Sequence, residues 1–156
     1  MATRLLNQCN VDSFVQLQEI KKILVPMDGS KNSLRGLDTA IYIARQCHAT
    51  LTGLYVMPIY PKSLLLKPIP YEAELAKNAR EFLTKAKTRS AQNGIVFNEK
   101  IVKGHAAEVI LDFAKEKKFD LIVIGARGLG SVKKAFLGSV SNAVVHKSKI
   151  RVLIVK

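Results

Sequence analysis

Residues 121–130 have the sequence LIVIGARGLG, in which a continuous apolar run, Leu121–Ile124, is followed directly by a loop with glycine at three of its six positions. An uninterrupted apolar run of this length, bounded by glycine, is typical of a strand that is covered on both faces. Strands of that kind belong almost entirely to parallel sheets that carry helices on both sides. This stretch therefore predicts an α/β fold with a glycine-rich loop at the carboxyl end of one of its strands.

On either side of this stretch, short apolar or β-branched runs alternate with segments of helical periodicity. The former predict strands and the latter predict helices. The expected strands are residues 23–25, 50–56, 96–102, 121–124 and 152–155, and the expected helices are residues 33–46, 71–92, 106–118 and 139–146. Strands that alternate with helices in this way favour a parallel sheet with helices on both faces. Ser30 or Asn32 is the expected N-cap of the first helix.

The chain divides into a short leading segment and one domain. Its 156 residues, 48% hydrophobic and 24% charged, have the composition of a globular domain. We expect residues 21–156 to form that domain and residues 1–20 to be an extension, either disordered or packed on the surface. No apolar run approaches the roughly 18 residues of a membrane-spanning helix, and the first ten residues lack the pattern of a signal peptide. Cys9 and Cys47 form neither a disulfide framework nor a zinc motif, so we expect a soluble, cytoplasmic protein.

The charge of the chain is strongly positive. Twenty-five lysines and arginines against twelve carboxylates give a formal net charge of +13. Such a surplus favours acidic partners, among them nucleotides, nucleic acid and anionic lipid, although it is equally compatible with a solvated surface. No carboxylate follows Asp120, whereas seven lysines and arginines do. A phosphate would therefore meet little repulsion from the last quarter of the chain.

Two loops are expected at the carboxyl ends of strands, where ligands of open parallel sheets bind. One is PMDGS, residues 26–30, and the other is GARGLG, residues 125–130, which Gly138-Ser139 follows at a predicted helix start. Glycine lets the backbone approach an anion closely, and the free N–H groups of a helix start attract phosphate. Ser139 and Ser141 can add hydroxyl donors. The pattern is neither a Walker A sequence nor a dinucleotide fingerprint.

Other kinds of site find little support. His48, His105 and His146 fall in different elements without metal-binding spacing, so we expect no metal centre built from protein ligands. Ser30 and Ser139 have no evident partners for a catalytic triad. The chain has no Trp and 6% aromatic residues, which gives single-stranded nucleic acid little to stack on.

The spacing Gly125-x2-Gly128-x9-Gly138-Ser139 resembles the nucleotide-binding motif of the universal stress protein family. The family's stretch typically reads like GSRGLG…LLGSVSE, where this chain has GARGLGSVKKAFLGSVSN, and ILVPMDGS resembles the family's first strand and Pro-x-Asp turn. The resemblance covers residues 21–156. It implies a doubly wound, Rossmann-like sheet of five parallel strands in the order 3-2-1-4-5, the fold of adenine nucleotide alpha hydrolases, with ATP, ADP or AMP at the strand ends. A Mg²⁺ or Mn²⁺ ion held through the phosphates is compatible with this ligand.

The resemblance also implies roles for particular residues. The adenine and ribose would be held by Pro26, Met27, Asp28 and Val56. The phosphates would lie against Ile124, Gly125, Arg127, Gly128, Gly138, Ser139, Val140 and Ser141. The family pairs its last strand across a two-fold axis, which here implies a homodimer through Arg151 to Val155. An exposed apolar edge strand needs such protection. The high charge and residues 1–20 depart from the family's common pattern and leave a further acidic partner open.

Two of these side chains have alternative interpretations. Asp28 is expected to accept hydrogen bonds from the nucleotide rather than only to hold its turn or cap the next helix. Arg127 is as compatible with a solvated loop cation as with a group that screens phosphate charge. Lys133 and Lys134, between the glycines, are interpreted as solvated rather than as a phosphate clamp.

Three hypotheses for the function follow. The leading one is an adenine-nucleotide-binding module of the stress response that changes conformation or partner with its ligand. The second is slow ATP hydrolysis, for which only Arg127 and Asp28 are candidate groups although phosphoryl transfer needs a positioned base, metal and cation. The third is a basic surface that binds nucleic acid or anionic membrane, with an affinity that falls steeply with salt.

Overall fold

The computed structural model describes residues 19–59, 70–130 and 137–156. The expected extension lies outside the described residues, apart from Glu19 and Ile20, and so do Lys133 and Lys134. In chain order the elements are β1 (Lys22–Pro26), α1 (Lys31–Cys47), β2 (Thr50–Met57), α2 (Pro70–Gln92), β3 (Phe97–Lys103), α3 (Ala106–Glu116), β4 (Leu121–Gly125), α4 (Ser139–Lys147) and β5 (Arg151–Val155). Every strand and helix expected from the sequence is therefore present, with ends shifted by one or two residues.

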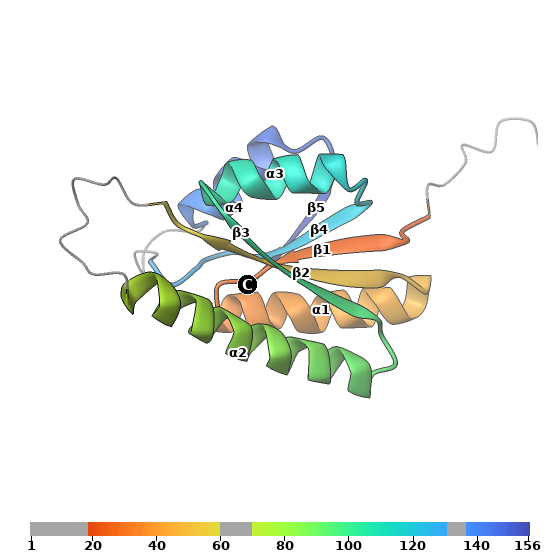
Figure 1. The fold of residues 1–156 in the computed structure, drawn as a ribbon. Helices are drawn as coiled ribbons and strands as arrows, with labels where there is room; N and C mark the ends of the chain where they lie inside the picture. Colours follow the sequence, from red (N-terminus) through yellow and green to blue (C-terminus); the bar gives the residue numbers. More distant parts are fainter. Residues whose placement is uncertain (1–18, 60–69, 131–136) are drawn as a thin grey trace, which may run out of the picture.

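The five strands form one parallel sheet in the order β3-β2-β1-β4-β5. Helices α1 and α2 cover one face of the sheet, and α3 and α4 cover the other (Figure 1). The chain winds outward from β1 to β3 and then returns to the middle of the sheet at β4. The expected doubly wound fold and its strand order are confirmed. The topological switch point lies between β1 and β4, where open α/β sheets place their ligands.

Apart from the exposed Lys22 at the start of β1, the residues of the two central strands are apolar, because both faces of these strands are buried. In β4 all five residues are buried, with Val123 facing the core under α1 and α2 and Ile122 facing the core under α3 and α4. In β1, Ile23 and Leu24 divide between the same two cores and are both 0% exposed. The apolar run that predicts the fold thus contributes side chains to both hydrophobic cores.

Helix α1 begins earlier than its periodicity suggests because Ser30 caps it. The Ser30 hydroxyl accepts a hydrogen bond from the Ser33 N–H at 3.2 Å, which satisfies one of the orphan donors of the first turn. The helix ends at His48, whose left-handed backbone returns its N–H to the Ala44 carbonyl. Of the two expected caps Ser30 is therefore confirmed, and the Asn32 side chain makes a different contact, described below.

A glycine in the middle of β2 makes room for an aromatic ring. Gly53 is buried and pairs with Val25 on one side and Glu99 on the other. A Cβ atom at this position would overlap the Phe97 ring and would lie 3.2 Å from a methyl group of Leu83. The core between β2, β3 and α2 therefore depends on the missing side chain.

We expect Gly53→Ala to lower the free energy of unfolding by about 1–3 kcal/mol, because the added methyl overpacks a closed core. Urea unfolding measures this change. Gly130→Ala is the control, since its added Cβ meets nothing within 4 Å, and it should change stability by less than about 0.5 kcal/mol. The smaller side chain of Phe97→Leu should restore part of the loss in the Gly53→Ala background. A Gly53→Ala protein as stable as the wild type would contradict this account of the core.

Candidate functional site

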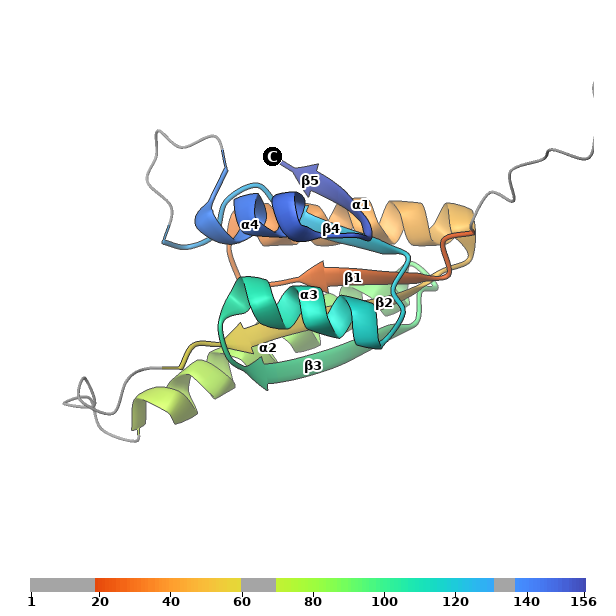
Figure 2. The same ribbon diagram turned by 90° about the horizontal axis from the view of Figure 1, so that it is seen from above.

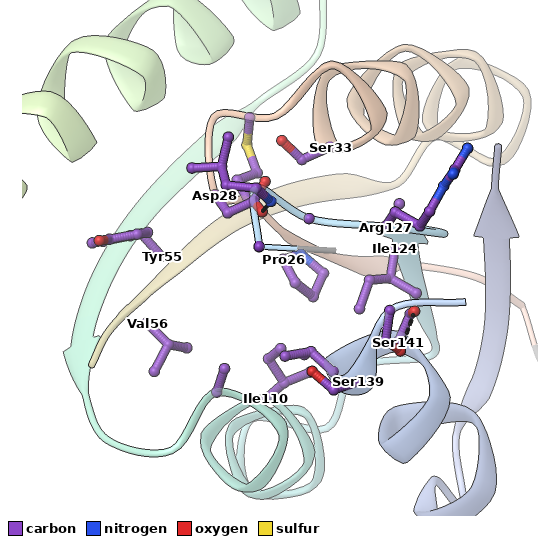
Figure 3. A pocket seen from close by; sticks show the side chains of 18 of the residues that line it. Pro26, Asp28, Ser33, Tyr55, Val56, Ile110, Ile124, Arg127, Ser139 and Ser141 are labelled. Atoms are coloured by element: carbon purple, nitrogen blue, oxygen red, sulfur yellow. Dashed lines mark hydrogen bonds between the residues drawn. The ribbon is translucent and has the colours of Figure 1, made fainter. Parts of the chain in front are cut away.

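A cavity of about 620 Å³ opens at the carboxyl edge of the sheet, over the switch point (Figure 3). Its walls come from the ends of β1, β2 and β4, the glycine-rich loop after β4, and the first turns of α3 and α4. Its volume lies within the range of small-molecule and cofactor sites. The sheet topology brings these segments together because the carboxyl ends of parallel strands share one edge.

All twelve site residues expected from the sequence line this cavity. They are Pro26, Met27, Asp28, Val56, Ile124, Gly125, Arg127, Gly128, Gly138, Ser139, Val140 and Ser141. Segments more than 100 residues apart in the chain thus meet in one place. That these residues contact a ligand stays a prediction.

The Asp28 carboxylate joins the two loops of the site. Its Oδ1 accepts a hydrogen bond from the Ser30 N–H at 2.9 Å, and its Oδ2 accepts one from the Leu129 N–H at 3.0 Å. The first bond holds the turn before α1, and the second holds the glycine-rich loop against that turn. Asp28 therefore has the structural role that the sequence left as an alternative. A carboxylate has about four acceptor positions, so this role is compatible with a ligand contact as well.

The three motif glycines, Gly125, Gly128 and Gly138, differ in how much space the surrounding chain leaves for a side chain. A Cβ on Gly125 would lie 2.7–2.9 Å from backbone atoms of Asn32 and Ser33, and a Cβ on Gly128 would overlap Asp28 Oδ2. These two glycines are needed so that α1 and Asp28 can pack against the loop. A Cβ on Gly138 would lie 3.5 Å from Arg127 Cα, an ordinary contact. Packing within the chain therefore does not explain the glycine at position 138.

Helix α4 begins at the cavity without a side-chain cap. Gly138 is its N-cap residue and has no side chain that could accept a hydrogen bond, in contrast to Ser30 at α1. Helix α3 also begins at this edge, and its N-cap residue, His105, makes no side-chain capping bond. The start of a helix carries unsatisfied N–H groups and a partial positive charge. Two helix starts at one cavity give it an affinity for negatively charged groups.

The two serines of α4 face different surroundings. Ser141 is 3% exposed, and its hydroxyl lies 2.7 Å from the Ala126 carbonyl, to which it donates. This bond, with that from the Gly138 N–H to the same carbonyl at 2.8 Å, fixes the start of α4 to the end of β4. Ser139 is exposed, and Figure 3 shows its side chain at the cavity. Of the two hydroxyls, that of Ser139 is the better placed to meet a ligand.

Arg127 contributes its backbone rather than its charge to the cavity wall. The Asn32 side-chain amide donates to the Arg127 carbonyl at 3.2 Å, a second link between α1 and the glycine-rich loop. The Arg127 side chain extends away from the cavity, beside the end of β5 (Figure 3). In this conformation the guanidinium does not screen a charge inside the cavity.

Eight further residues line the cavity that were not among the expected site residues. They are Ser33, Tyr55, Pro58, Ala106, Ile110, Leu129, Gly130 and Leu137. Ile110 closes the cavity from the α3 side, opposite Pro26 and Val56 (Figure 3). Two sequence signals point to some of these residues: Leu129 and Gly130 belong to the glycine-rich loop expected at this edge of the sheet, and the expected helix start at residue 106 lies at the same edge.

Within the described ranges, no three His, Cys, Asp or Glu side chains lie close enough to hold a metal ion. Among the helices in the part of the chain that the structure describes, none is both long and apolar enough to cross a membrane.

Comparisons with known proteins identify a family and several relatives that this chain resembles. The model of the universal stress protein family matches residues 19–156. A universal stress protein of Methanocaldococcus jannaschii is 35% identical over 139 residues, which cover 87% of this chain and 82% of that protein. One of Bacillus subtilis is 35% identical over 145 residues, which cover 86% of this chain and 98% of that protein.

Solved structures of universal stress proteins have a fold similar to that of this chain. The universal stress protein UspA of Lactobacillus plantarum has a TM-score of 0.78 at 28% identity, covering 88% of this chain and 99% of that one. A universal stress protein solved in complex with cAMP has a TM-score of 0.70 at 29% identity, covering 88% and 98%.

We expect Asp28→Asn to lower the free energy of unfolding by about 1 kcal/mol, because an amide can accept only one of the two N–H groups that the carboxylate accepts. Urea unfolding measures the loss. Asp38→Asn is the matched control. Asp38 pairs with Arg89 on the surface, and such exposed pairs contribute little. Equal effects of the two substitutions would mean that Asp28 does not hold the loops together.

Proposed function

Since the chain belongs to the universal stress protein family, we propose that its cavity binds an adenine nucleotide, ATP first with ADP and AMP as alternatives. We further propose that this binding regulates the conformation or the partner of the protein in a cytoplasmic stress response. The observation that carries the proposal is the start of α4, which faces the cavity with neither a side-chain cap nor a side chain at Gly138. Phosphate oxygens are suitable partners for the N–H groups of such a helix start.

The remainder of the cavity suits a nucleoside. Pro26, Val56, Ile110 and Ile124 give it apolar walls against which a flat base can pack. Asp28, at the border between these walls and the glycine-rich loop, supplies acceptors for ribose hydroxyls or base amino groups. The relative solved with cAMP supports the same class of ligand.

The proposal is binding rather than rapid hydrolysis. Asp28 is the one carboxylate among the described lining residues, and both of its oxygens already accept backbone hydrogen bonds. Phosphoryl transfer needs a positioned base, a metal ion and a cation near the transferred group. A Mg²⁺ or Mn²⁺ ion would be held through the phosphates, and the exposed Ser139 hydroxyl at the α4 start would be available as a further ligand.

Gly138→Val tests the proposed phosphate site. We expect at least a tenfold loss of ATP affinity by isothermal titration calorimetry with Mg²⁺ present, since a branched side chain at the α4 start would exclude phosphate. The melting temperature should change little, because a Cβ at this position makes only ordinary contacts. Asn142→Val is the matched control, since Asn142 is exposed on the same helix and does not line the cavity, and it should bind ATP within about threefold of the wild type. Undiminished binding by Gly138→Val would refute the proposed site.

We also propose that β5 mediates a homodimer. In the structure β5 pairs with β4 along one side, and its other side forms an edge of the sheet. Leu153 on this strand is 36% exposed, and Val145 on the neighbouring α4 is 37% exposed. An apolar edge strand left uncovered promotes pairing with another chain. Pairing with a second copy of β5 would cover both side chains.

Leu153→Glu should convert the dimer to a monomer, because it places a charge in each half of the proposed interface. Light scattering coupled to size-exclusion chromatography measures the mass. Ile101→Glu is the matched control, since Ile101 is also 36% exposed and lies on the opposite edge strand, β3. A dimer that survives Leu153→Glu but dissociates with Ile101→Glu would assign the interface to β3 instead.

A further inference from the structure

The amino edge of the sheet, at the end opposite the cavity, carries a dense group of cations. We call this group the basic face. It consists of seven exposed residues: Lys21, Lys22, Lys117, Lys118, Lys147, Lys149 and Arg151. They occupy the segments that lead into β1, β4 and β5, which are neighbours in the sheet.

The register of the strands and the direction of the helices place these cations at the same edge of the molecule. Ile23 pairs with Leu121, and Leu121 pairs with Arg151, so the three strands begin side by side. Helices α3 and α4 run antiparallel to the strands and end at the same edge, on the right of Figure 2. The basic face therefore has two rows. One row lies at the strand starts, and the other lies at the ends of the helices that pack on the sheet.

The carboxylates of these segments do not balance the cations. Glu19, Glu116 and Asp120 are the three acidic residues in the same segments. Glu19 pairs with Lys21 at 2.9 Å, which lowers the pKa of Glu19 and raises that of Lys21, so both stay charged at neutral pH. Asp120 Oδ2 accepts the backbone N–H groups of Lys21 and Lys22, each at 2.9 Å. These contacts hold the start of β1 in place and leave a local excess of positive charge.

Favourable interaction with helix dipoles explains only part of this excess. Basic residues are common in the last turn of a helix because they complement its negative end. Lys147 occupies such a position in α4. Lys118, Lys149 and Arg151 lie beyond the helices, in turns or at a strand start. At the other end of the strands, by contrast, Lys103 pairs with Glu72 at 2.6 Å.

The basic face has the features of a purely electrostatic surface. Among the described residues, none of the large exposed apolar side chains lies in the segments that carry the basic face, residues 19–22, 116–121 and 147–151. These segments therefore offer neither a stacking platform for bases nor a wedge for insertion. Because helices end at this edge rather than begin, their N–H groups do not point toward a bound phosphate. The Lys22 ammonium donates to the Lys117 carbonyl at 2.6 Å and lies over the Phe119 ring, and Lys21 is paired with Glu19. Recognition must therefore rely mainly on the side chains of the other five cations, which suit a diffuse layer of negative charge.

We propose that the basic face docks on the surface of an anionic lipid bilayer. Two rows of cations at one level match a plane of negative charge, whereas the cylinder of a nucleic-acid duplex would meet mainly one row at a time. Juxtaposed lysines and arginines of this number give substantial attraction to an anionic leaflet. Docking through this edge turns the cavity of the docked protomer, at the opposite ends of its strands, away from the membrane and leaves it open to solvent. In the proposed homodimer the two β5 strands would run antiparallel across the two-fold axis, so one protomer docks at a time.

Co-sedimentation of the full chain with vesicles tests this proposal. The vesicles contain phosphatidylcholine alone or with about 30% phosphatidylserine, at about 0.1 M NaCl. We expect binding to the anionic vesicles only, weakening as salt rises. The triple variant Lys117→Glu, Lys118→Glu, Lys149→Glu should lower the partition coefficient on the order of 100-fold or more.

A second triple variant separates the basic face from net charge. Lys31→Glu, Lys77→Glu, Arg80→Glu changes three exposed cations in α1 and in the first half of α2, away from the amino edge. Both variants lower the net charge by the same amount, and circular dichroism confirms that both fold. The control should keep vesicle binding within about threefold of the wild type. Three results would each overturn the proposal. They are equal losses of vesicle binding in both variants, failure of the wild type to bind anionic vesicles, and binding of a short DNA duplex in preference to vesicles.

Discussion

The candidate site depends on the hydrogen bonds that the Asp28 carboxylate makes to two different loops. One oxygen accepts from Ser30 and holds the turn after β1, and the other accepts from Leu129, 101 residues further along the chain. Gly128 has no side chain at the point where the carboxylate approaches. With the bond from Asn32 to the Arg127 carbonyl, this arrangement fixes the glycine-rich loop to the start of α1. The loop thereby forms a wall of a defined cavity.

Parallel strands make the two ends of the molecule chemically different. Every helix returns antiparallel to the sheet, so helices begin at the carboxyl edge and end at the amino edge (Figure 2). The carboxyl edge therefore offers N–H groups and positive helix ends that suit a small anion in a cavity. The amino edge carries the carbonyl ends of the helices instead, so an anion can be attracted there only by side chains, among them the lysines of the basic face. The proposed nucleotide site and the proposed membrane surface can consequently be used at the same time.

Local sequence pattern predicted the strands, the helices and the parallel sheet, because both central strands are apolar on two faces and Leu121–Ile124 suits only a doubly covered strand. The strand order and the twelve site residues were implied by the family resemblance, and all twelve line the cavity, since a loop motif fixes which backbone lies at the strand ends. The sequence did not predict that Arg127 points away from the cavity or that the Ser141 hydroxyl is bound to Ala126. It also missed Ile110, whose position depends on how α3 packs across the sheet. Side-chain direction and helix packing are set by tertiary contacts that no local pattern records.

Hydrogen exchange of the full-length protein with and without ATP, followed by mass spectrometry, tests the central claim most directly. If an adenine nucleotide occupies the cavity, amides of residues 26–30, 125–130 and 137–141 should exchange more slowly in its presence. Amides at the amino edge, around residues 117–121 and 147–151, should be unchanged. Slower exchange confined to the amino edge, or no change at saturating ATP, would contradict the account and leave the cavity without a nucleotide.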